Sequence, residues 1–282
     1  MSGARIRQQV AFILMGIVTS LVVIPIVLTI WYVVANGISA VSLDFITQPP
    51  RNGMREGGIL PAIIGTVILI IGTMLLSLPV GVLSAIYLVE YAGDNLFTRL
   101  IKLSVVNLSG IPSIVYGLFG LAVFVVLLRM GTSILAGCMT LAIMSLPVII
   151  TSTKEALEAV PASYREISLS LGATKWQTVR HCVLPYAIPG ILTGTVLSLS
   201  RAAGETAPIL FTVAAFYLPR LPRGIFDQVM ALPYHLYVIS TQIPNMPLAL
   251  SFATAFVLIV LVFLMNLVSI ILRAHYRRKK QW

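Results

Sequence analysis

Charged residues, cysteines and histidines are all scarce in this chain. Asp, Glu, Lys and Arg together make up 10% of its 282 residues, whereas 58% are hydrophobic, and the mean hydropathy is +0.99. That balance excludes an ordinary soluble domain. The two cysteines, Cys138 and Cys182, offer neither a disulfide framework nor metal-ligand spacing. The histidines are scattered as well, so we predict no metal site and expect each histidine at a surface or interface: His181, His235 and His275.

The motifs of an enzyme are missing too. A phosphate-binding loop needs a lysine directly after a glycine, in the pattern Gly-x-x-x-x-Gly-Lys-Ser/Thr, and none of the lysines follows a glycine. Serine and aspartate residues form no nucleophile motif. We therefore predict that the chain is not an enzyme, that it binds no cofactor itself, and that any energy it uses comes from another chain.

Long apolar runs are what the chain has in abundance. Several exceed the roughly 20 residues with which a helix crosses a bilayer, and the first run, residues 10–35, is too long for the apolar part of a signal peptide. The runs predict an all-α integral membrane protein with six transmembrane helices, at roughly 10–35, 60–91, 98–128, 133–153, 187–215 and 248–272. The third span should break near Gly110-Ile111-Pro112. Residues 1–60 would hold the first helix and an external loop, residues 61–272 the transmembrane core, and residues 273–282 a basic tail.

The distribution of Lys and Arg predicts which side of the membrane each loop faces. The N-terminus, the 92–102 loop, the polar segment 154–186 and the C-terminal tail hold 13 of these residues, and the loops on the opposite side hold five. Cytoplasmic segments carry the excess of positive charge. Both termini and segment 154–186 are therefore predicted to be cytoplasmic, and segment 216–247 external.

Segment 154–186 is the longest polar interval between apolar runs, and it is predicted to form two short helices. Ser163 to Glu166 and Thr174 to Gln177 both fit the capping box at a helix start, and Gly172 is placed to end the first helix. One face of that helix is a mixed apolar stripe: Tyr164, Ile167, Ser168 and Leu171. Periodicity alone leaves two interpretations open, because the stripe could cover the chain's own membrane bundle or headgroups, or it could dock on a partner.

The fifth span contains the other unusual feature, the charged pair Arg201 and Glu205. A charge near the bilayer centre costs about 2.5–3.5 kcal/mol, whereas an i, i+4 pair stabilises a helix by only a few tenths of a kcal/mol. Pairing within the helix therefore cannot explain the two charges, although pairing with another helix or subunit could. We favour an oxyanion site. A guanidinium binds oxyanions through a fork of N–H donors, a carboxylate accepts a hydrogen bond from hydrogen phosphate but repels sulfate, and Thr206 adds a hydroxyl. Gly204 and Pro208 weaken the helix there, as in transporter binding sites.

Segment 154–186 resembles the EAA loop of ABC-importer permeases. Glu166-Ile167-Ser168, Gly172 and Leu184-Pro185 hold the register of that motif, with Ile167 and Ser168 in place of two alanines and Cys182 in place of isoleucine. The resemblance implies a type I ABC-importer permease fold and a coupling helix that docks on an ATPase. The residues that would make this contact are Tyr164, Glu166, Ile167, Ser168, Leu171 and Gly172.

The charged pair lies in a second segment with a family likeness. Residues 200–208 (SRAAGETAP), 111–119 (IPSIVYGLF) and 231–233 (ALP) resemble the phosphate-importer permeases of the PstA type. The resemblance implies that Arg201, Glu205 and Thr206 line the anion path of a multi-pass protein in the bacterial cytoplasmic membrane. It also implies four kinds of partner: a homologous permease of the PstC type, two ATPase subunits of the PstB type that bind ATP and Mg, an external phosphate-binding protein of the PstS type, and the lipid bilayer.

Three other functions stay open. The same fold could import molybdate, sulfate or a phosphonate instead. A membrane enzyme could use Arg201 to hold a phosphorylated lipid, although the chain shows no catalytic constellation. A non-transporting scaffold or sensor subunit is the third, and it predicts that uptake survives loss of this chain.

Overall fold

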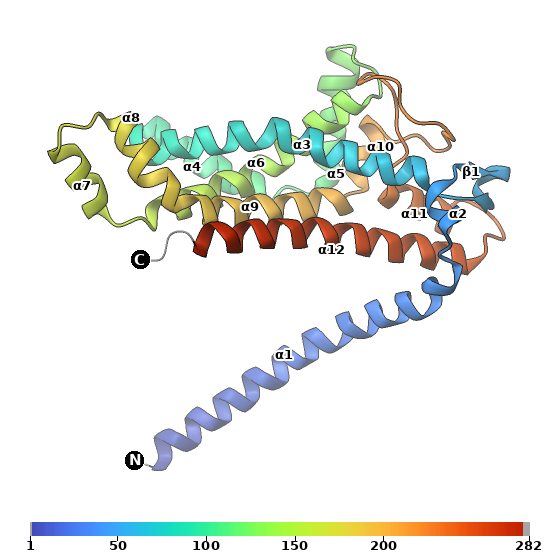
Figure 1. Cartoon of the computed structure of the whole chain (residues 1–282), viewed down its shortest axis with the longest axis horizontal. Helices are drawn as coiled ribbons and strands as arrows, with labels where there is room; N and C mark the ends of the chain where they lie inside the picture. Colours follow the sequence, from blue (N-terminus) through green and yellow to red (C-terminus); the bar gives the residue numbers. More distant parts are fainter. Residues whose placement is uncertain (1, 279–282) are drawn as a thin grey trace.

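Long apolar helices make up most of the chain, as its composition predicts. The computed structural model describes residues 2–278, except for the side chains of a few residues near the two ends of that range. Among these residues, five helices are long and apolar enough to cross a membrane, and a bent pair of helices makes a sixth span. The main helices of the spans are α1 (Ser2–Gly37), α3 (Leu60–Ile86), α6 (Ile134–Glu158), α9 (Leu184–Gly204) and α12 (Leu248–Arg278) (Figure 1).

The third predicted span is the bent one. It consists of α4 (Leu96–Ser109) and α5 (Ser113–Gly120), which continues into the π-helical segment η4 (Leu121–Leu127), and the two halves meet at 107°. Pro112 is the N-cap of α5, with extended backbone (ψ 139°). Because proline has no N–H and disfavours helical geometry in the residue before it, α4 cannot run on through this point. The break predicted near Gly110-Ile111-Pro112 is confirmed.

The centre of the bundle is α6, which packs against both α3 and α9. Its most apolar window is 61% buried, more than that of any other span in the described part of the chain. Two glycines let α9 cross it closely: a Cβ on Gly190 would lie 2.5 Å from Ala156 Cβ, and one on Gly194 would lie 1.8 Å from Ser152 Oγ. Small residues at such spacing allow helix backbones to approach in membranes.

Each end of the bundle has its own apolar core. One core is formed by the N-terminal parts of α3 and α6 together with α10 (Ala207–Thr212) and α11 (Leu232–Thr241). The other joins the C-terminal parts of α3 and α6 to α9 and to η5 (Val179–Val183). The first end also carries α2 (Leu43–Thr47) and a short antiparallel hairpin of β1 (Pro50–Arg51) and β2 (Glu56–Gly57), with Pro50 paired to Gly57.

The loop after α10 completes the start of α6. Backbone N–H groups in the first turn of a helix have no partner within it. Here the N–H of Ile134 donates to the carbonyl of Asp227 and that of Leu135 to the carbonyl of Ile225, both at 2.9 Å. The Asp227 carboxylate in turn accepts from the N–H of Arg223 at 2.8 Å, a bond that lowers the pKa of this carboxyl. The loop is thus an ordered cover over this end of the bundle.

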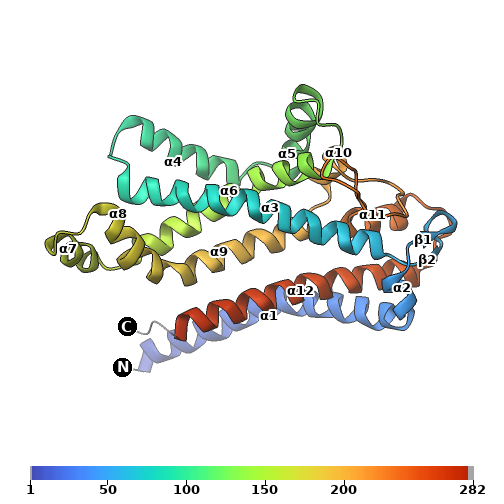
Figure 2. The same ribbon diagram turned by 45° about the horizontal axis from the view of Figure 1, so that its top comes forward.

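Both ends of the described chain lie at the end of the molecule opposite the hairpin (Figures 1 and 2), but Figure 1 shows them well apart from each other. The short helices α7 (Ala162–Ser170) and α8 (Lys175–Thr178) share that end. Helix α1 diverges from the bundle, and its apolar window is 0% buried. It is held at its C-terminal part, where Tyr32 meets Phe252 of α12 with ring centroids 5.5 Å apart.

Candidate functional site

The charged pair lies at a break in the fifth span. Helix α9 stops at Gly204, Glu205 is extended (φ −73°, ψ 130°), and α10 starts two residues later. A continuing helix would need the N–H of residue 208 to bond the carbonyl of residue 204, and Pro208 has no N–H to donate. The weakness predicted at Gly204 and Pro208 is confirmed. The predicted end of this span at residue 215 is wrong, because α10 ends at Thr212.

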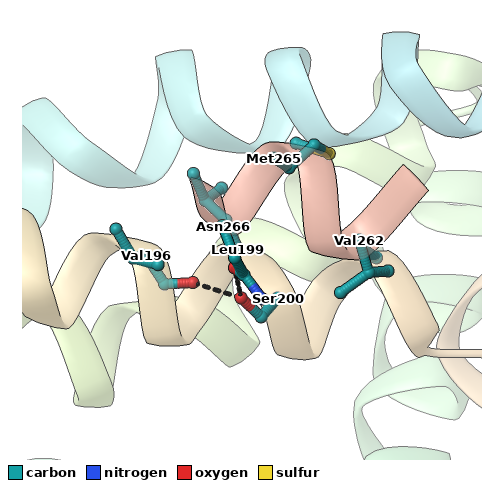
Figure 3. A pocket seen from close by; sticks show the side chains of 7 residues that line it. Val196, Leu199, Ser200, Val262, Met265 and Asn266 are labelled. Carbon is teal, nitrogen blue, oxygen red and sulfur yellow. Dashed lines mark hydrogen bonds between the residues drawn. The ribbon is translucent and has the colours of Figure 1, made fainter. Parts of the chain in front are cut away.

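The side chain of Arg201 lies on a face of α9 that the chain leaves uncovered. Thr193, Leu197, Arg201 and Gly204 share this exposed face, and 43% of the Arg201 side chain is exposed. The preceding residue faces the other way: Ser200 meets Asn266 of α12 across the seam between the two helices (Figure 3). Arg201 therefore lies on the exposed side of α9, with its side chain partly open.

Arg201 and Glu205 form an ion pair with spare hydrogen-bonding capacity. Arg201 Nε donates to Glu205 Oε1 at 3.2 Å, and the Glu205 side chain is only 15% exposed. In the described part of the chain this is the one hydrogen bond of the guanidinium, which has five N–H donors, and the hydroxyl of Thr206 has no partner there. The structure thus places Arg201 in contact with Glu205, and Thr206 follows directly in the chain at the same helix break. Their free donors suit a tetrahedral oxyanion, which accepts bonds from a guanidinium fork.

A second predicted motif packs against this break. A Cβ on Gly117 of α5 would lie 2.9 Å from the carbonyl oxygen of Ala207 and 3.0 Å from Cα of Pro208, so only glycine allows this approach. The neighbouring Tyr116 is 5% exposed, and its hydroxyl donates to the carbonyl of Leu108 at 2.7 Å. Tyr116 thereby fixes the bend between α4 and α5. It was not predicted as a site residue, although the likeness of segment 111–119 pointed to it.

Segment 154–186, called the elbow from here on, has the two short helices expected of it, but the first of them starts earlier than predicted. The capping box at Thr174 is confirmed: its N–H donates to Gln177 Oε1 at 2.8 Å, and Gln177 N–H donates to Thr174 Oγ1 at 3.3 Å. Gly172 has φ +81° and ends the first helix as predicted. The capping box at Ser163 is wrong, because α7 starts at Ala162 after Pro161 and Ser163 already lies inside the helix.

The predicted stripe on α7 is divided between two environments. The ring of Tyr164 packs at a tilt against that of Tyr186, with centroids 5.1 Å apart. Ser168 Oγ lies 2.9 Å from Thr178 Oγ1, so Tyr164 and Ser168 both face the chain's own helices. Ile167 and Leu171 are 62% and 82% exposed. The edge of the buried face falls between residues 167 and 168, which are about 100° apart on a helix, and Leu171 follows the end of α7. Glu166 and Gly172 are exposed as well.

The histidines differ from one another in burial. His181 is exposed, in agreement with the predicted surface or interface position. His235 is 4% exposed and lies inside the chain's own fold, so the same prediction is wrong for it. The cause is α11, which packs between α3 and α12. Burial lowers the pKa of His235 to about 4. The side chain of His275 lies outside the described residues. Among those that are described, no group of His, Cys, Asp or Glu side chains is placed to hold a metal ion.

Comparison with known proteins defines the class. The sequence model of the family described as "Binding-protein-dependent transport system inner membrane component" matches residues 77–281, which include the elbow and the helix break. The chain belongs to this family: it is a multi-pass permease subunit of a binding-protein-dependent transporter.

Similar proteins within this family are permeases of ABC transporters and of phosphate transport systems. The chain is 33% identical over 279 residues to the "Probable ABC transporter permease protein YqgI" of Bacillus subtilis, covering 94% of each chain. It is 35% identical over 268 residues to the phosphate transport system permease protein PstA of Mycobacterium leprae, covering 93% of this chain and 87% of that one. The similarity to PstA 1 of Mycobacterium tuberculosis is 34% over 284 residues, covering 98% and 91%.

Solved structures share the fold. The bacterial alginate ABC transporter in complex with its pentasaccharide-bound periplasmic protein superposes with a TM-score of 0.64 at 15% identity, covering 95% of this chain and 93% of that one. The inward-facing MetNI methionine ABC transporter superposes with a TM-score of 0.58 at 19% identity, covering 78% and 94%. The fold is therefore that of the type I ABC-importer permeases.

Proposed function

We propose that this chain is the permease subunit of an ATP-driven importer of inorganic phosphate in the bacterial cytoplasmic membrane. The observation that carries the proposal is the position of Arg201, with Glu205 and Thr206, at a helix break on the open face of α9. The PstA relatives are phosphate transport system permease proteins, and this supports phosphate as the cargo. In this proposal a homologous permease of the PstC type faces the open side of α9, and an external PstS-type protein delivers phosphate.

Charge selection would take place between the two side chains of the pair. The guanidinium of Arg201 donates to phosphate oxygens, and the carboxylate of Glu205 accepts from the P–OH group of hydrogen phosphate. A fully ionised anion such as sulfate has no proton to offer, so the same carboxylate repels it. The hydroxyl of Thr206 adds a further donor or acceptor.

The energy would come from two ATPase subunits of the PstB type, which bind ATP and Mg. We assign the cytoplasmic side to the end of the molecule with the elbow and both termini, because that end carries most of the Lys and Arg. The exposed residues Glu166, Ile167, Leu171 and Gly172 then form the surface that docks on an ATPase, with Tyr164 and Ser168 fixing α7 from behind. Closure of the ATPase pair on ATP would move α7 and change access to Arg201 from external to internal.

Replacing Arg201 tests the proposal. In vesicles that hold the complete complex, we expect Arg201→Gln to lower the rate of phosphate uptake at least tenfold, because the neutral amide lacks both the charge and the fork. Arg51→Gln, an exposed arginine in the hairpin, is the matched control and should transport as the wild type does. Unchanged uptake by Arg201→Gln would remove this residue from the path. A competition assay tests the cargo. If sulfate or molybdate blocks uptake and phosphate does not, the transported anion is not phosphate.

A further inference from the structure

A second arginine, Arg165, connects the elbow to the membrane helices. It lies on α7, directly before the exposed Glu166, but its side chain turns inward and is 21% exposed. Its guanidinium meets Glu90 in η3 (Tyr87–Tyr91), the π-helical end of α3. Arg165 Nη2 donates to Glu90 Oε1 at 2.7 Å and Nε to the same oxygen at 3.1 Å.

The same guanidinium also holds the end of α6. Nη2 donates to the carbonyl of Leu157 at 2.9 Å, and Nη1 donates to the carbonyl of Val160 at 2.8 Å. Carbonyl groups at the end of a helix lack the usual i+4 partner; the Leu157 carbonyl also accepts from the N–H of Val160 at 3.2 Å, and Arg165 adds a bond to each of the two carbonyls. One side chain thus joins three elements, namely α7, the end of α3 and the end of α6.

Burial of Glu90 makes its ion pair with Arg165 important for stability. The Glu90 side chain is 8% exposed, and in the described residues Arg165 is its only ion-pair partner. A buried carboxylate without its partner is strongly unfavourable. A lysine at residue 165 would keep the charge, but its single ammonium cannot reproduce the planar fork that reaches both the carboxylate and the two carbonyls.

From α6 the contacts continue to the anion site. Ala156, next to Leu157, lies against Gly190 of α9, and one turn earlier Ser152 lies against Gly194. Arg201 is on the same helix, two turns further on. A displacement of α7 therefore reaches α9 through close-packed contacts between rigid helices, and packed interfaces of this kind move as units.

We propose that Arg165 and Glu90 are positioning residues that transmit the movement of the elbow to α3 and α6, and through α6 to the anion site. This inference rests on the proposed function, since it requires an ATPase at the elbow. Its consequence is specific: without the pair, the complex still hydrolyses ATP, but hydrolysis no longer drives transport.

The test compares phosphate taken up per ATP hydrolysed in vesicles that hold the complete complex. The double variant E90Q/R165M removes both charges, so that no unpaired charge is left buried. We expect it to hydrolyse ATP at a rate within about twofold of the wild type, and to take up at least tenfold less phosphate per ATP. The ratio is independent of the amount of assembled complex, so a merely structural role of the pair would not change it.

Asp94 and Arg99 provide the matched control. They form an ion pair of 2.8 Å within the 92–102 loop, which is predicted to be cytoplasmic, but their side chains are 76% and 66% exposed, and exposed pairs contribute little. The variant D94N/R99M should therefore keep the wild-type ratio. R165K, which keeps the ion pair and loses bonds to the carbonyls, should give a ratio between those of the wild type and the double variant.

Two results would overturn the inference. One is a ratio in E90Q/R165M within twofold of the wild type. The other applies if the double variant does not assemble. R165K is then the test, and a wild-type ratio of phosphate taken up per ATP in R165K would contradict transmission through Arg165. Failure of the proposed function looks different, because the wild-type complex would then take up no phosphate. If the wild type takes up another anion, the ratio is measured with that anion.

Discussion

Arg165 and Arg201 are 36 residues apart and have opposite surroundings. Arg165 makes contacts through all three of its guanidinium nitrogens, with Glu90 and two helix-end carbonyls. Arg201 uses one nitrogen on Glu205 and leaves the others free within the described chain. A saturated guanidinium holds a structure together, and an unsaturated one on an open face can receive a ligand. The two arginines therefore have different expected responses to the same substitution.

At Arg201, lysine should preserve part of the function. Arg201→Lys keeps a positive charge at the helix break but replaces the planar fork with a single ammonium. We expect the maximal rate of phosphate uptake to fall about three- to tenfold, or about 1 kcal/mol. The phosphate concentration at half-maximal uptake should not change, because in the proposed complex the external binding protein captures the anion. Uptake kinetics with Arg51→Lys as the control measure both values, and a rate equal to that of Arg201→Gln would contradict a graded role of the fork.

The sequence predicted Arg201, Glu205 and Thr206 as neighbours because an unusual charge in an apolar run can be seen without a structure. It could not predict which way Arg201 faces, since that depends on the contacts of α9 with α6 and α12. The pairing of Arg165 with Glu90 was missed for a related reason. Periodicity describes one helix at a time, and it carries no information on two residues that meet from different elements 75 positions apart.

At the scale of the helix, the crossing of α9 over α6 depends on two glycines. A methyl group at residue 194 would lie 1.8 Å from Ser152 Oγ and 2.3 Å from Ser152 Cβ. A rotamer change can move the hydroxyl but not the Cβ, so the helices must separate. Overpacking of this kind typically costs about 1–3 kcal/mol.

Gly194→Ala should therefore lower the apparent melting temperature of the purified subunit by several degrees in a detergent thermal-shift assay. Adding Ser152→Gly, which removes both clashing atoms, should recover part of the loss. Gly224→Ala is the control, because a Cβ there has no neighbour within 4 Å. If the control and Gly194→Ala melt alike, the two helices are not in close contact at this crossing.

The prediction of helices was most successful where a single local property of the sequence, such as an apolar run or a proline, determines the structure. The spans 60–91 and 248–272 are apolar, and the structure has helical segments there, with α12 continuing to Arg278. The bends near Pro112 and Glu205 were foreseen because proline and glycine act locally. The size of the first bend, 107°, was not, since it follows from the packing of α4 and α5 on other helices. Likewise, Ser163 fits a capping box, but Pro161 starts the helix earlier.

At the scale of the whole molecule, the end with the hairpin contains a buried titratable group. His235 on α11, outside the candidate spans, lines a small cavity together with Phe45, Glu56 and Leu250. Its pKa is about 4 in the folded chain against 6.5 ordinarily. Between these values the unfolded chain binds more protons than the folded one, so stability falls as the pH drops from about 6.5 to about 4 and levels off below.

The full effect of His235 is on the order of 3 kcal/mol. We expect the thermal unfolding temperature of the wild-type subunit in detergent to drop between pH 7 and pH 4.5, and to drop less in His235→Gln, which has no charge to gain. His181→Gln, with its exposed ring, should behave as the wild type does. Equal pH dependence in His235→Gln and the wild type would show that this histidine is not buried in solution.

The open face of α9 has a consequence for how the selectivity for the transported anion can change in evolution. One exposed helix face cannot enclose an anion path, and Arg201 lies on a face of α9 that this chain does not cover. In the proposed function, the dimensions of the anion path and the groups opposite the guanidinium are set by the partner permease that faces α9. A change of cargo could accordingly arise from substitutions in that neighbour alone, with every residue of the present chain unaltered.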